Sequence, residues 1–354
     1  MKVLWLTDYY DPTDAGKIPG GVEARCYYVA KYFPKNIFLK VISRPADQWR
    51  PAGVSAIPER LFFTFNLLLD GLTTDFDLVE GTNYSNYLIA WLLGVLKGKP
   101  VVFWYADVFI GQWIKNMGLI GVAGEAAERL TLMAPGVKYI AISEVTKAKL
   151  VRSGIKPEMV TVIGCGVDRQ EISKIIKEKV TKKYDIVAVS RLVPYKRVDD
   201  LIQAVALLKK IFPKIKVAIV GEGPEKINLA KLTDRLGLGL NISFLGRIEK
   251  HEDVLRIIAS GQVFCHPSVV EGYGIVVAEA MALKVPYVAS DIEVIGEITN
   301  NGKGGALFRP KDVQNLAEKL TAVRSSPKRK LFSINSWRDV AVETEKQYEN
   351  LLYH

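Results

Sequence analysis

Short apolar runs alternate with segments of helical periodicity along the whole chain. Most of these runs are apolar at every position, which is typical of strands that are buried on both faces of a parallel sheet. The pattern predicts ten strands: Val3–Leu6, Leu39–Ile42, Leu78–Val79, Val101–Phe103, Tyr139–Ile142, Ile186–Ser190, Val217–Val220, Ile242–Phe244, Val263–Cys265 and Tyr287–Ala289. Helical patterns such as Val198–Lys210 fill the gaps between them. Strands that alternate with helices indicate an α/β fold with doubly wound layers.

The strand series restarts near Tyr184. The chain has 354 residues, about twice the usual length of a single domain. A Gly-rich stretch at 164–168 and a charged segment up to Lys183 precede the restart and indicate a crossing between domains. We therefore expect two Rossmann-like domains facing a cleft, residues 1–165 and 166–336. A helical pattern at 337–354 is expected to pack back on the first domain.

The composition excludes several classes of site. The chain has only three cysteines, far apart in sequence, and only three histidines, so we expect neither a disulfide framework nor a metal site. The run Met1–Asp8 is too short for a secretion signal and predicts a buried strand, and we expect a cytoplasmic protein. The segments Leu61–Leu69 and Tyr87–Leu96 are too short to span a membrane. They predict core helices, with contact at a membrane surface as the alternative.

The formal net charge of +10 fits a polyanionic ligand such as a nucleotide, or an anionic membrane face. Basic residues are spread along the chain and no nucleic-acid-binding signature occurs, so nucleic acid is not an expected partner.

The segment Glu271-Gly-Tyr-Gly-Ile-Val-Val-Ala-Glu279 carries the clearest chemistry. It follows the predicted strand Val263–Cys265 and places a glycine turn and a predicted helix between two carboxylates. Ligands of open α/β sheets bind at the carboxyl ends of strands, and a helix N-terminus with glycine amides favours a phosphate. Because carboxylates repel phosphate, we expect the two glutamates to serve a neighbouring polyol or the reaction itself.

Two cations five residues apart, Arg191 and Lys196, follow the first strand of the second domain and suit a diphosphate. Gly221 ends the next strand in an incomplete dinucleotide pattern that does not support NAD binding, and Gly20-Gly21 precede the first helix. The pair Asp75-Phe-Asp77 has the spacing of a metal-binding motif, but its place before Leu78 predicts a structural role.

An ordered series of segments resembles the nucleotide-sugar domain of family-four glycosyltransferases, which have the GT-B fold. The series comprises Ser190 to Lys196, Gly221 to Glu225, Phe244 to Arg247, Pro267 to Ala282 and Pro286 to Ser290, followed by Glu297 and Gly305. The glycines at 20–21 and the segment Gly166-Val-Asp168 also resemble segments of that family. The resemblance covers nearly the whole chain and is stronger in the second half.

The resemblance implies a retaining enzyme that needs no metal or other cofactor. Arg191 and Lys196 would hold the donor diphosphate, Glu271 would lie by the transferred sugar, and Glu279 would hold the ribose hydroxyls. We therefore expect Glu271, Arg191 and Lys196 to be catalytic. The residues expected to bind the donor are Gly20, Gly21, Gly221, Arg247, Gly272, Tyr273, Gly274, Ile275 and Glu279.

One departure concerns the first domain. Many family members carry a histidine at the end of a first-domain strand, beside the transferred sugar. The matching stretch of this chain, residues 102–108, has no histidine, and we expect Tyr105, Asp107 or backbone groups to take its place.

The expected function is transfer of a hexose from a UDP-, GDP- or ADP-sugar to a glycan or a polyisoprenyl-lipid-linked acceptor. A basic chain with apolar first-domain segments also fits association with an anionic membrane surface. Two alternatives stay open: an epimerase that acts on nucleotide sugars, and a non-catalytic subunit that binds them.

Overall fold

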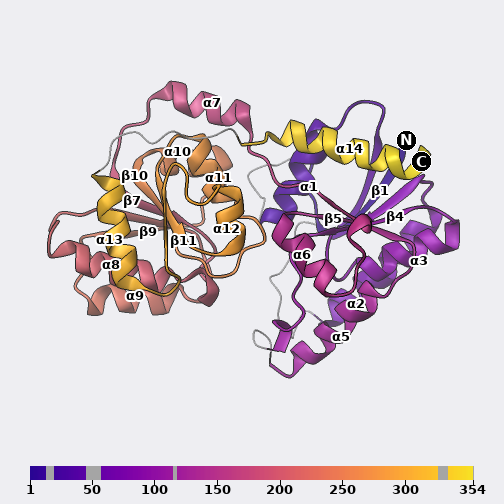
Figure 1. Ribbon diagram of the computed structural model, residues 1–354, viewed down its shortest axis with the longest axis horizontal. Coiled ribbons are helices and arrows are strands. Elements are labelled where there is room, and N and C mark those ends of the chain that lie inside the picture. Colours follow the sequence, from indigo (N-terminus) through magenta and orange to yellow (C-terminus); the bar gives the residue numbers. More distant parts are fainter. Residues whose placement is uncertain (13–19, 45–56, 115–117, 326–333, 354) are drawn as a thin grey trace. The chain divides into compact units, whose positions relative to one another are not determined.

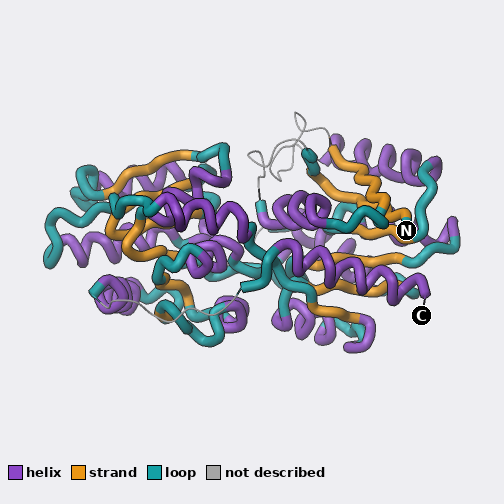
Figure 2. Tube along the Cα trace, turned by 90° about the horizontal axis from the view of Figure 1, so that it is seen from above, coloured by secondary structure: helices purple, strands orange, loops and turns teal. Residues whose placement is uncertain are grey.

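The computed structural model describes residues 1–12, 20–44, 57–114, 118–325 and 334–353. The chain divides into two compact units (Figure 1). The first comprises Met1–Cys165 and Trp337–His354, and the second comprises Gly166–Ser336. In each unit, helices lie on both faces of a central sheet (Figure 2).

The sheet of the first unit has six parallel strands in the order β2-β1-β3-β4-β5-β6. The strands are β1 (Lys2–Tyr9), β2 (Phe38–Arg44), β3 (Leu78–Gly81), β4 (Val101–Tyr105), β5 (Val137–Ala141) and β6 (Val160–Val162). The direction in which strands are added reverses between β1 and β3. Such a reversal opens a crevice at the carboxyl ends of the two strands.

The helices of the first unit are α1 (Gly21–Tyr32), α2 (Ile57–Thr73), α3 (Tyr87–Lys97), α5 (Ile120–Leu132), α6 (Glu144–Arg152), the 3-10 turn η4 (Pro157–Met159) and α14 (Trp337–Tyr353). Alternate residues of β1 face the two helical layers, as strand geometry requires. Leu4 and Leu6 lie in a core cluster with α3 residues such as Leu93, whereas Trp5 faces α1 and α14.

A buried polar network joins α14 to the first sheet. Arg25 of α1 pairs with Glu80 of β3, and the hydroxyl of Tyr348 in α14 donates to Glu80 at 2.6 Å. Trp5 donates its indole N–H to the same hydroxyl at 2.8 Å, and its ring lies 4.6 Å from the Arg25 guanidinium. None of the four residues is more than 1% exposed, so each polar group depends on the others for its hydrogen bonds.

The second unit also has a six-stranded parallel sheet, in the order β12-β11-β10-β7-β8-β9. The strands are β7 (Tyr184–Val189), β8 (Val217–Val220), β9 (Ile242–Gly246), β10 (Gly261–His266), β11 (Tyr287–Ser290) and β12 (Ala306–Phe308). Here the direction of strand addition reverses between β7 and β10. Their carboxyl ends therefore flank the expected ligand crevice.

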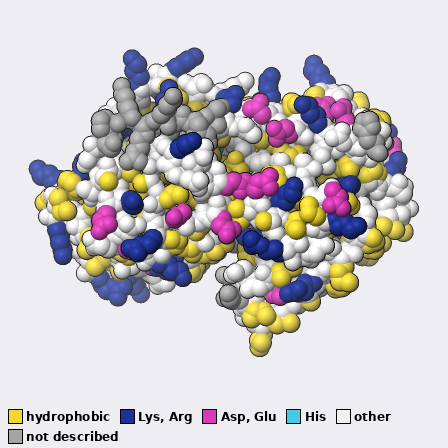
Figure 3. All heavy atoms as spheres, in the orientation of Figure 1, with side chains coloured by type: hydrophobic (Ala, Val, Ile, Leu, Met, Phe, Trp, Pro, Cys, Tyr) yellow, Lys and Arg dark blue, Asp and Glu magenta, His cyan; other side chains and the backbone are white. Residues whose placement is uncertain are grey.

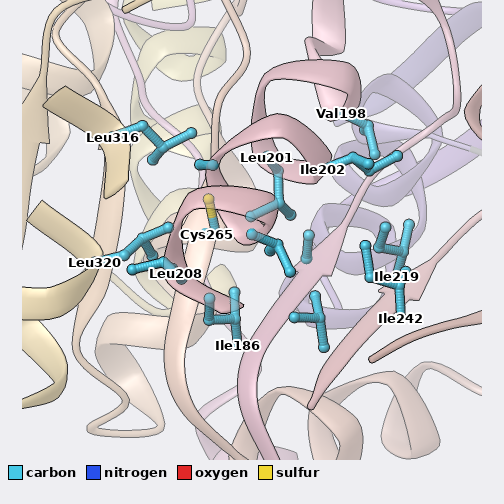
Figure 4. Packing of buried hydrophobic residues seen from close by; sticks show 14 of the residues in the cluster. Ile186, Val198, Leu201, Ile202, Leu208, Ile219, Ile242, Cys265, Leu316 and Leu320 are labelled. Atoms are coloured by element: carbon cyan, nitrogen blue, oxygen red, sulfur yellow. The ribbon is translucent and has the colours of Figure 1, made fainter. Parts of the chain in front are cut away.

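The helices of the second unit are α7 (Arg169–Glu178), η5 (Pro194–Lys196), α8 (Val198–Lys209), α9 (Lys226–Arg235), α10 (His251–Ala259), α11 (Ile275–Ala282), α12 (Glu293–Ile298) and α13 (Val313–Arg324). Figure 4 shows Leu201 and Leu208 of α8 packed with Leu316 and Leu320 of α13 over strand residues such as Ile186. α7, α10 and α11 pack against one another in a separate group.

All ten predicted strands are present, so the doubly wound α/β prediction is confirmed. The sequence pattern did not reveal β6 and β12, which are three-residue strands at sheet edges. It also did not predict α7, although Ile172 and Ile175 have the i, i+3 spacing of a buried helical face, because the many charged residues of this segment favoured a crossing between domains. Short edge strands are partly exposed and lack the continuous apolar run that marks a central strand.

The two apolar segments of the first unit form parts of α2 and α3, which pack against each other and include the buried residues Leu67, Ala90 and Leu93. Within the described residues, none of the helices combines the length and hydropathy needed for a membrane span. Asp75 and Asp77 lie at the amino end of β3. Asp75 pairs with the Lys2 side chain and Asp77 accepts a hydrogen bond from the Lys2 amide, which fits their predicted structural role.

Candidate active site

The candidate site lies in the second unit, at the reversal between β7 and β10. The loop and turn after β7 carry Arg191 and Lys196, and the loop after β10 carries Glu271. A backbone hydrogen bond of 2.9 Å from the Val269 amide to the Tyr195 carbonyl fastens these two loops together. Lys196 and Glu271, which are 75 positions apart in sequence, are thereby brought into contact.

Glu271 accepts hydrogen bonds from two residues through the same carboxylate oxygen. Lys196 Nζ lies 2.5 Å and His266 Nε2 lies 2.6 Å from Glu271 Oε1. His266 is the last residue of β10 and is 2% exposed, and the Lys196 and Glu271 side chains are 13% and 10% exposed. The three side chains therefore form a compact cluster that excludes most water.

The ionised form of Glu271 is strongly favoured. Burial opposes ionisation, but the charges of Lys196 and His266 and their hydrogen bonds outweigh it and hold the pKa of Glu271 well below its usual value. The carboxylate stays charged at neutral pH while it is sheltered from solvent. A sheltered carboxylate can stabilise positive charge that develops on a bound molecule.

The glycine turn positions the start of α11. Gly274 is the N-cap of this helix and has a left-handed backbone (φ 96°), and a side chain there would meet Ile295 Cδ1 at 2.8 Å. Gly272, Tyr273 and Gly274 therefore precede the helix and Ile275 is its first residue. The first amides of a helix lack internal partners and attract anions.

Glu279 lies one helical turn further along α11 and is buried, with its side chain 8% exposed. Its Oε1 atom is 2.8 Å from Nε2 of His251 in α10, and Nδ1 of His251 is 2.9 Å from Glu171 Oε2 in α7. Glu271 and Glu279 thus have different partners: Lys196 and His266 for the first, His251 for the second. The two carboxylates are therefore held by separate hydrogen-bond networks.

Gly221 follows β8 and Arg247 follows β9, both at the carboxyl ends of the strands. Gly221 has a φ of 132°, and a side chain at this position would lie 1.8 Å from the Ser190 carbonyl oxygen. The glycine therefore allows the end of β8 to approach the loop that carries Arg191. Arg191 is exposed and donates to the Tyr195 hydroxyl at 2.9 Å, and Arg247 is exposed beyond the edge strand β9.

The first-unit candidates differ in their accessibility. Gly20 is the N-cap of α1 and Gly21 is its first residue. Tyr105 points into the core, where its fully buried ring stacks on Tyr87 with centroids 4.6 Å apart. This geometry does not favour a sugar contact by Tyr105. Asp107 lies beyond the carboxyl end of β4, where its side chain is 10% exposed and pairs with Lys149 at 2.6 Å.

Sequence reasoning missed His266 and His251. His266 could have been found, because it directly follows a predicted strand and lies five residues before Glu271. His251 carried no local signal, because its partners lie on two other helices, 80 and 28 residues away. Among the residues that the structure describes, no group of three His, Cys, Asp or Glu side chains is arranged to hold a metal ion.

Two family models match the chain and between them extend from residue 19 to residue 336. The model of glycosyl transferases group 1 matches residues 168–336, which include the whole candidate site. The model of glycosyltransferase family 4 matches residues 19–171. The chain belongs to the family-four glycosyltransferases.

Solved structures of glycosyltransferases have the same fold as this family-four chain. HepE from Anabaena, solved in complex with UDP and glucose, covers 99% of the chain and is itself covered over 100% of its length, with a TM-score of 0.71 and 19% identity. Sucrose-phosphate synthase from Thermosynechococcus elongatus covers 99% of the chain, with 98% of its own length matched, a TM-score of 0.77 and 18% identity. The two-domain GT-B fold predicted from the sequence is confirmed.

Curated relatives of this family-four chain include the gpi3 component of the phosphatidylinositol N-acetylglucosaminyltransferase of Schizosaccharomyces pombe. It is 26% identical over 57% of the chain and 46% of its own length. Glycogen synthase of Mycobacterium tuberculosis is 28% identical over 53% of the chain and 48% of its own length. The chain thus spans about half the length of these relatives.

Proposed function

We propose that this family-four chain transfers a hexose from a nucleoside diphosphate sugar to an acceptor, with retention of the anomeric configuration and without a metal ion. The observation that carries the proposal is the convergence of Lys196 and His266 on Glu271 at the reversal between β7 and β10. This cluster joins a cation and a sheltered carboxylate in the loop that leads to the glycine-rich start of α11.

The charges of the site suit departure of a nucleoside diphosphate. Negative charge builds on the diphosphate as the glycosidic bond breaks, and the groups assigned to stabilise it are Lys196, Arg191 and the first amides of α11. The anomeric carbon gains oxocarbenium character in the same step, and the ionised Glu271 can stabilise it. Three protein groups therefore supply the cation chemistry that a metal ion supplies in other transferases.

The site divides the donor between its two glutamates. Glu271 is assigned to the transferred sugar, and Glu279, on the helix that follows, is assigned to the ribose hydroxyls. UDP-sugars are the first donors to test, because HepE was solved with UDP and with UDP-glucose. Asp107 is the first-unit residue that we propose beside the sugar.

The decisive experiment is a panel of UDP-, GDP- and ADP-sugars, with nucleotide release measured with and without acceptor and product configuration determined by NMR. We expect release that depends on an acceptor, resists EDTA and yields the donor's anomeric configuration. Glu271→Gln should lose turnover by about a hundredfold or more while it keeps most of its nucleotide affinity. Inversion of configuration would overturn the proposed retention. Full inhibition by EDTA that added Mg²⁺ reverses would overturn the proposed independence of a metal ion.

A matched control for the cations is Lys209→Ala. Lys209 lies at the far end of α8 from Lys196 and donates to the carbonyl of Gly237 at the surface. Lys196→Ala should weaken donor binding and turnover together, and Lys209→Ala should change neither. Equal effects of the two variants would mean that Lys196 acts only through general surface charge.

The two alternative functions predict different results from the same panel. An epimerase would convert the donor without an acceptor, and the product would be a new nucleotide sugar. A non-catalytic subunit would bind a nucleoside diphosphate without releasing sugar. Calorimetry that detects no binding of UDP, GDP or ADP would reject nucleotide-sugar chemistry altogether.

We also propose that the acceptor is lipid-linked and that the first unit contacts an anionic membrane face from the cytoplasmic side. Exposed apolar side chains support this: Leu119 at 89%, Leu130 at 60% and Met133 at 77%, all on or beside α5. Hydrophobic side chains are visible at the surface of the lobe that carries this helix (Figure 3). The name of the Schizosaccharomyces pombe relative, which refers to phosphatidylinositol, is consistent with a lipid acceptor.

Flotation with vesicles of anionic and of neutral phospholipid tests this part. Binding to anionic vesicles that weakens with salt is expected. Leu130→Ser combined with Met133→Ser should reduce it, whereas Val342→Ser, at an exposed position on α14, should not. No binding to anionic vesicles at low salt would exclude the membrane contact without affecting the proposed transfer reaction.

A further inference from the structure

His251 occupies an unusual place between two carboxylates. It is the first residue of α10, and its two ring nitrogens point to different helices: Nδ1 to Glu171 of α7 at 2.9 Å, and Nε2 to Glu279 of α11 at 2.8 Å. The His251 side chain is 23% exposed and that of Glu279 is 8% exposed. The contact therefore joins three helices at a partly buried place.

Only one protonation state satisfies both contacts. A neutral imidazole carries one N–H and one acceptor nitrogen, so it cannot donate to two carboxylates. The imidazolium donates from both nitrogens. Burial disfavours this charge, but Glu279 and Glu171 outweigh the effect and raise the pKa of His251 to about 10. At neutral pH the residue is a fixed cation.

We propose that His251 is a positioning residue of the donor site, which holds the Glu279 carboxylate in the orientation that accepts the ribose hydroxyls. The inference rests on the proposed binding of a nucleoside diphosphate sugar. A carboxylate can accept about four hydrogen bonds, and the contact with His251 uses one of these sites, on Oε1. Holding a flexible side chain before the ligand arrives reduces the entropy lost on binding.

Glu171 completes the arrangement. Without a second partner, the imidazole ring could rotate about its side-chain bonds and lose its aim at Glu279. The hydrogen bond from Nδ1 to Glu171 fixes the ring plane from the opposite side. The role parallels the support that ligand residues receive from hydrogen-bonded neighbours in metal sites. Because Glu171 belongs to α7, the first helix after the domain crossing, its removal should loosen the ribose contact from a distance.

The chain offers a matched control on the same two helices. Arg256 of α10 pairs with Glu178 of α7 at 2.8 Å, so it also ties these helices together. Its other hydrogen bonds go to two carboxylates of its own helix. Arg256→Gln therefore removes an ion pair between α7 and α10 and leaves the contact between His251 and Glu279 in place. A purely structural role for His251 predicts that Arg256→Gln and His251→Gln behave alike.

The experiment measures the ribose contact directly. UDP, GDP and ADP are titrated by calorimetry into the full chain, and the nucleotide that binds is compared with its 2′,3′-dideoxy form. In the wild type, loss of the ribose hydroxyls should weaken binding about tenfold. His251→Gln and Glu279→Gln should reduce this ratio to about two or less, and Arg256→Gln should leave it at the wild-type value.

The outcomes separate the inference from the function on which it rests. An unchanged ribose ratio in His251→Gln overturns the positioning role, and so does an equal loss in Arg256→Gln. If His251→Gln does not fold, Glu171→Gln replaces it, with an intermediate ratio expected and the wild-type ratio as the overturning result. Failure of every nucleotide to bind the wild type rejects both. If the affinity ratios of the variants are as expected but the wild type transfers no sugar, the proposed function is rejected and the inference about His251 is kept.

Discussion

Removal of the Lys196 ammonium should destabilise the second unit because it leaves a buried carboxylate with one partner instead of two. In Lys196→Met the side chain keeps its apolar length and loses only the charge and hydrogen bonds. The Glu271 side chain, which is 10% exposed in the wild type, should keep its contact with His266, which is 2.6 Å long there. The magnitude of the effect depends on how well His266 alone compensates the Glu271 charge.

At an effective dielectric constant of about 20, unit charges 2.5 Å apart attract by roughly 6–7 kcal/mol, and desolvation of both groups cancels much of this. Breaking a buried pair by removing one partner typically costs about 3–5 kcal/mol. Since His266 remains, we expect a loss of about 3 kcal/mol in the free energy of unfolding. Lys196→Met combined with Glu271→Gln should recover about 2 kcal/mol of that loss, because no unpaired charge is left.

The distribution of tryptophan allows a clean assay. All six tryptophans, residues 5, 49, 91, 104, 113 and 337, belong to the first unit. Urea unfolding followed by far-UV circular dichroism reports both units, whereas tryptophan fluorescence reports the first unit alone. Lys196→Met should lower the midpoint of the dichroism transition and leave the fluorescence transition in place. Lys209→Ala serves as the control, with neither midpoint changed by more than the measurement error.

The pH dependence gives an independent check. The pKa of Glu271 is lower in the folded state than its ordinary value of 4.5, so its stabilisation is complete above about pH 4.5 and is lost as the pH falls below that value. Glu271→Gln should therefore flatten the acid limb of the stability profile. The reasoning is refuted if Lys196→Met costs less than about 1 kcal/mol, or if the double variant is as unstable as the sum of the two single variants.

Three further predictions concern other parts of the molecule. The pKa of His251 is raised from 6.5 to about 10, so its contribution to stability should be complete below pH 6.5 and disappear as the pH rises to 10. Unfolding curves of His251→Gln should lack this loss of stability at alkaline pH. Tyr348→Phe should cost about 1–3 kcal/mol in the tryptophan-fluorescence transition, because Glu80 and Trp5 both lose a buried partner, whereas the exposed Tyr353→Phe should be neutral. Gly221→Ala should lower the free energy of unfolding, measured by circular dichroism, by more than about 2 kcal/mol and should weaken nucleotide binding. Gly237 also has a positive φ but has open space around it, so Gly237→Ala should cost only about 1 kcal/mol. Equal losses of stability in the two variants would contradict the packing argument.

The sequence determined ten strands of the two sheets, all except the short edge strands β6 and β12, because buried parallel strands must be apolar at nearly every position and this requirement is visible without any tertiary information. It also identified Glu271, Glu279, Arg191 and Lys196 as candidates, since each follows a predicted strand or a glycine turn. Local chemistry and spacing were sufficient to select these residues as candidates, and their roles stay predictions.

Only the tertiary structure decided which side chains meet. Periodicity cannot tell which face of a doubly covered strand a residue occupies, so the burial of Tyr105 against Tyr87 was not predictable from its position. Likewise, the contacts of Lys196 with Glu271 and of His251 with Glu279 depend on the order of strands in the sheet and on the packing of helices from different parts of the chain. A sequence pattern indicates whether each single residue is buried. A site depends on contacts between residues that are far apart in sequence, and only the folded chain brings these together.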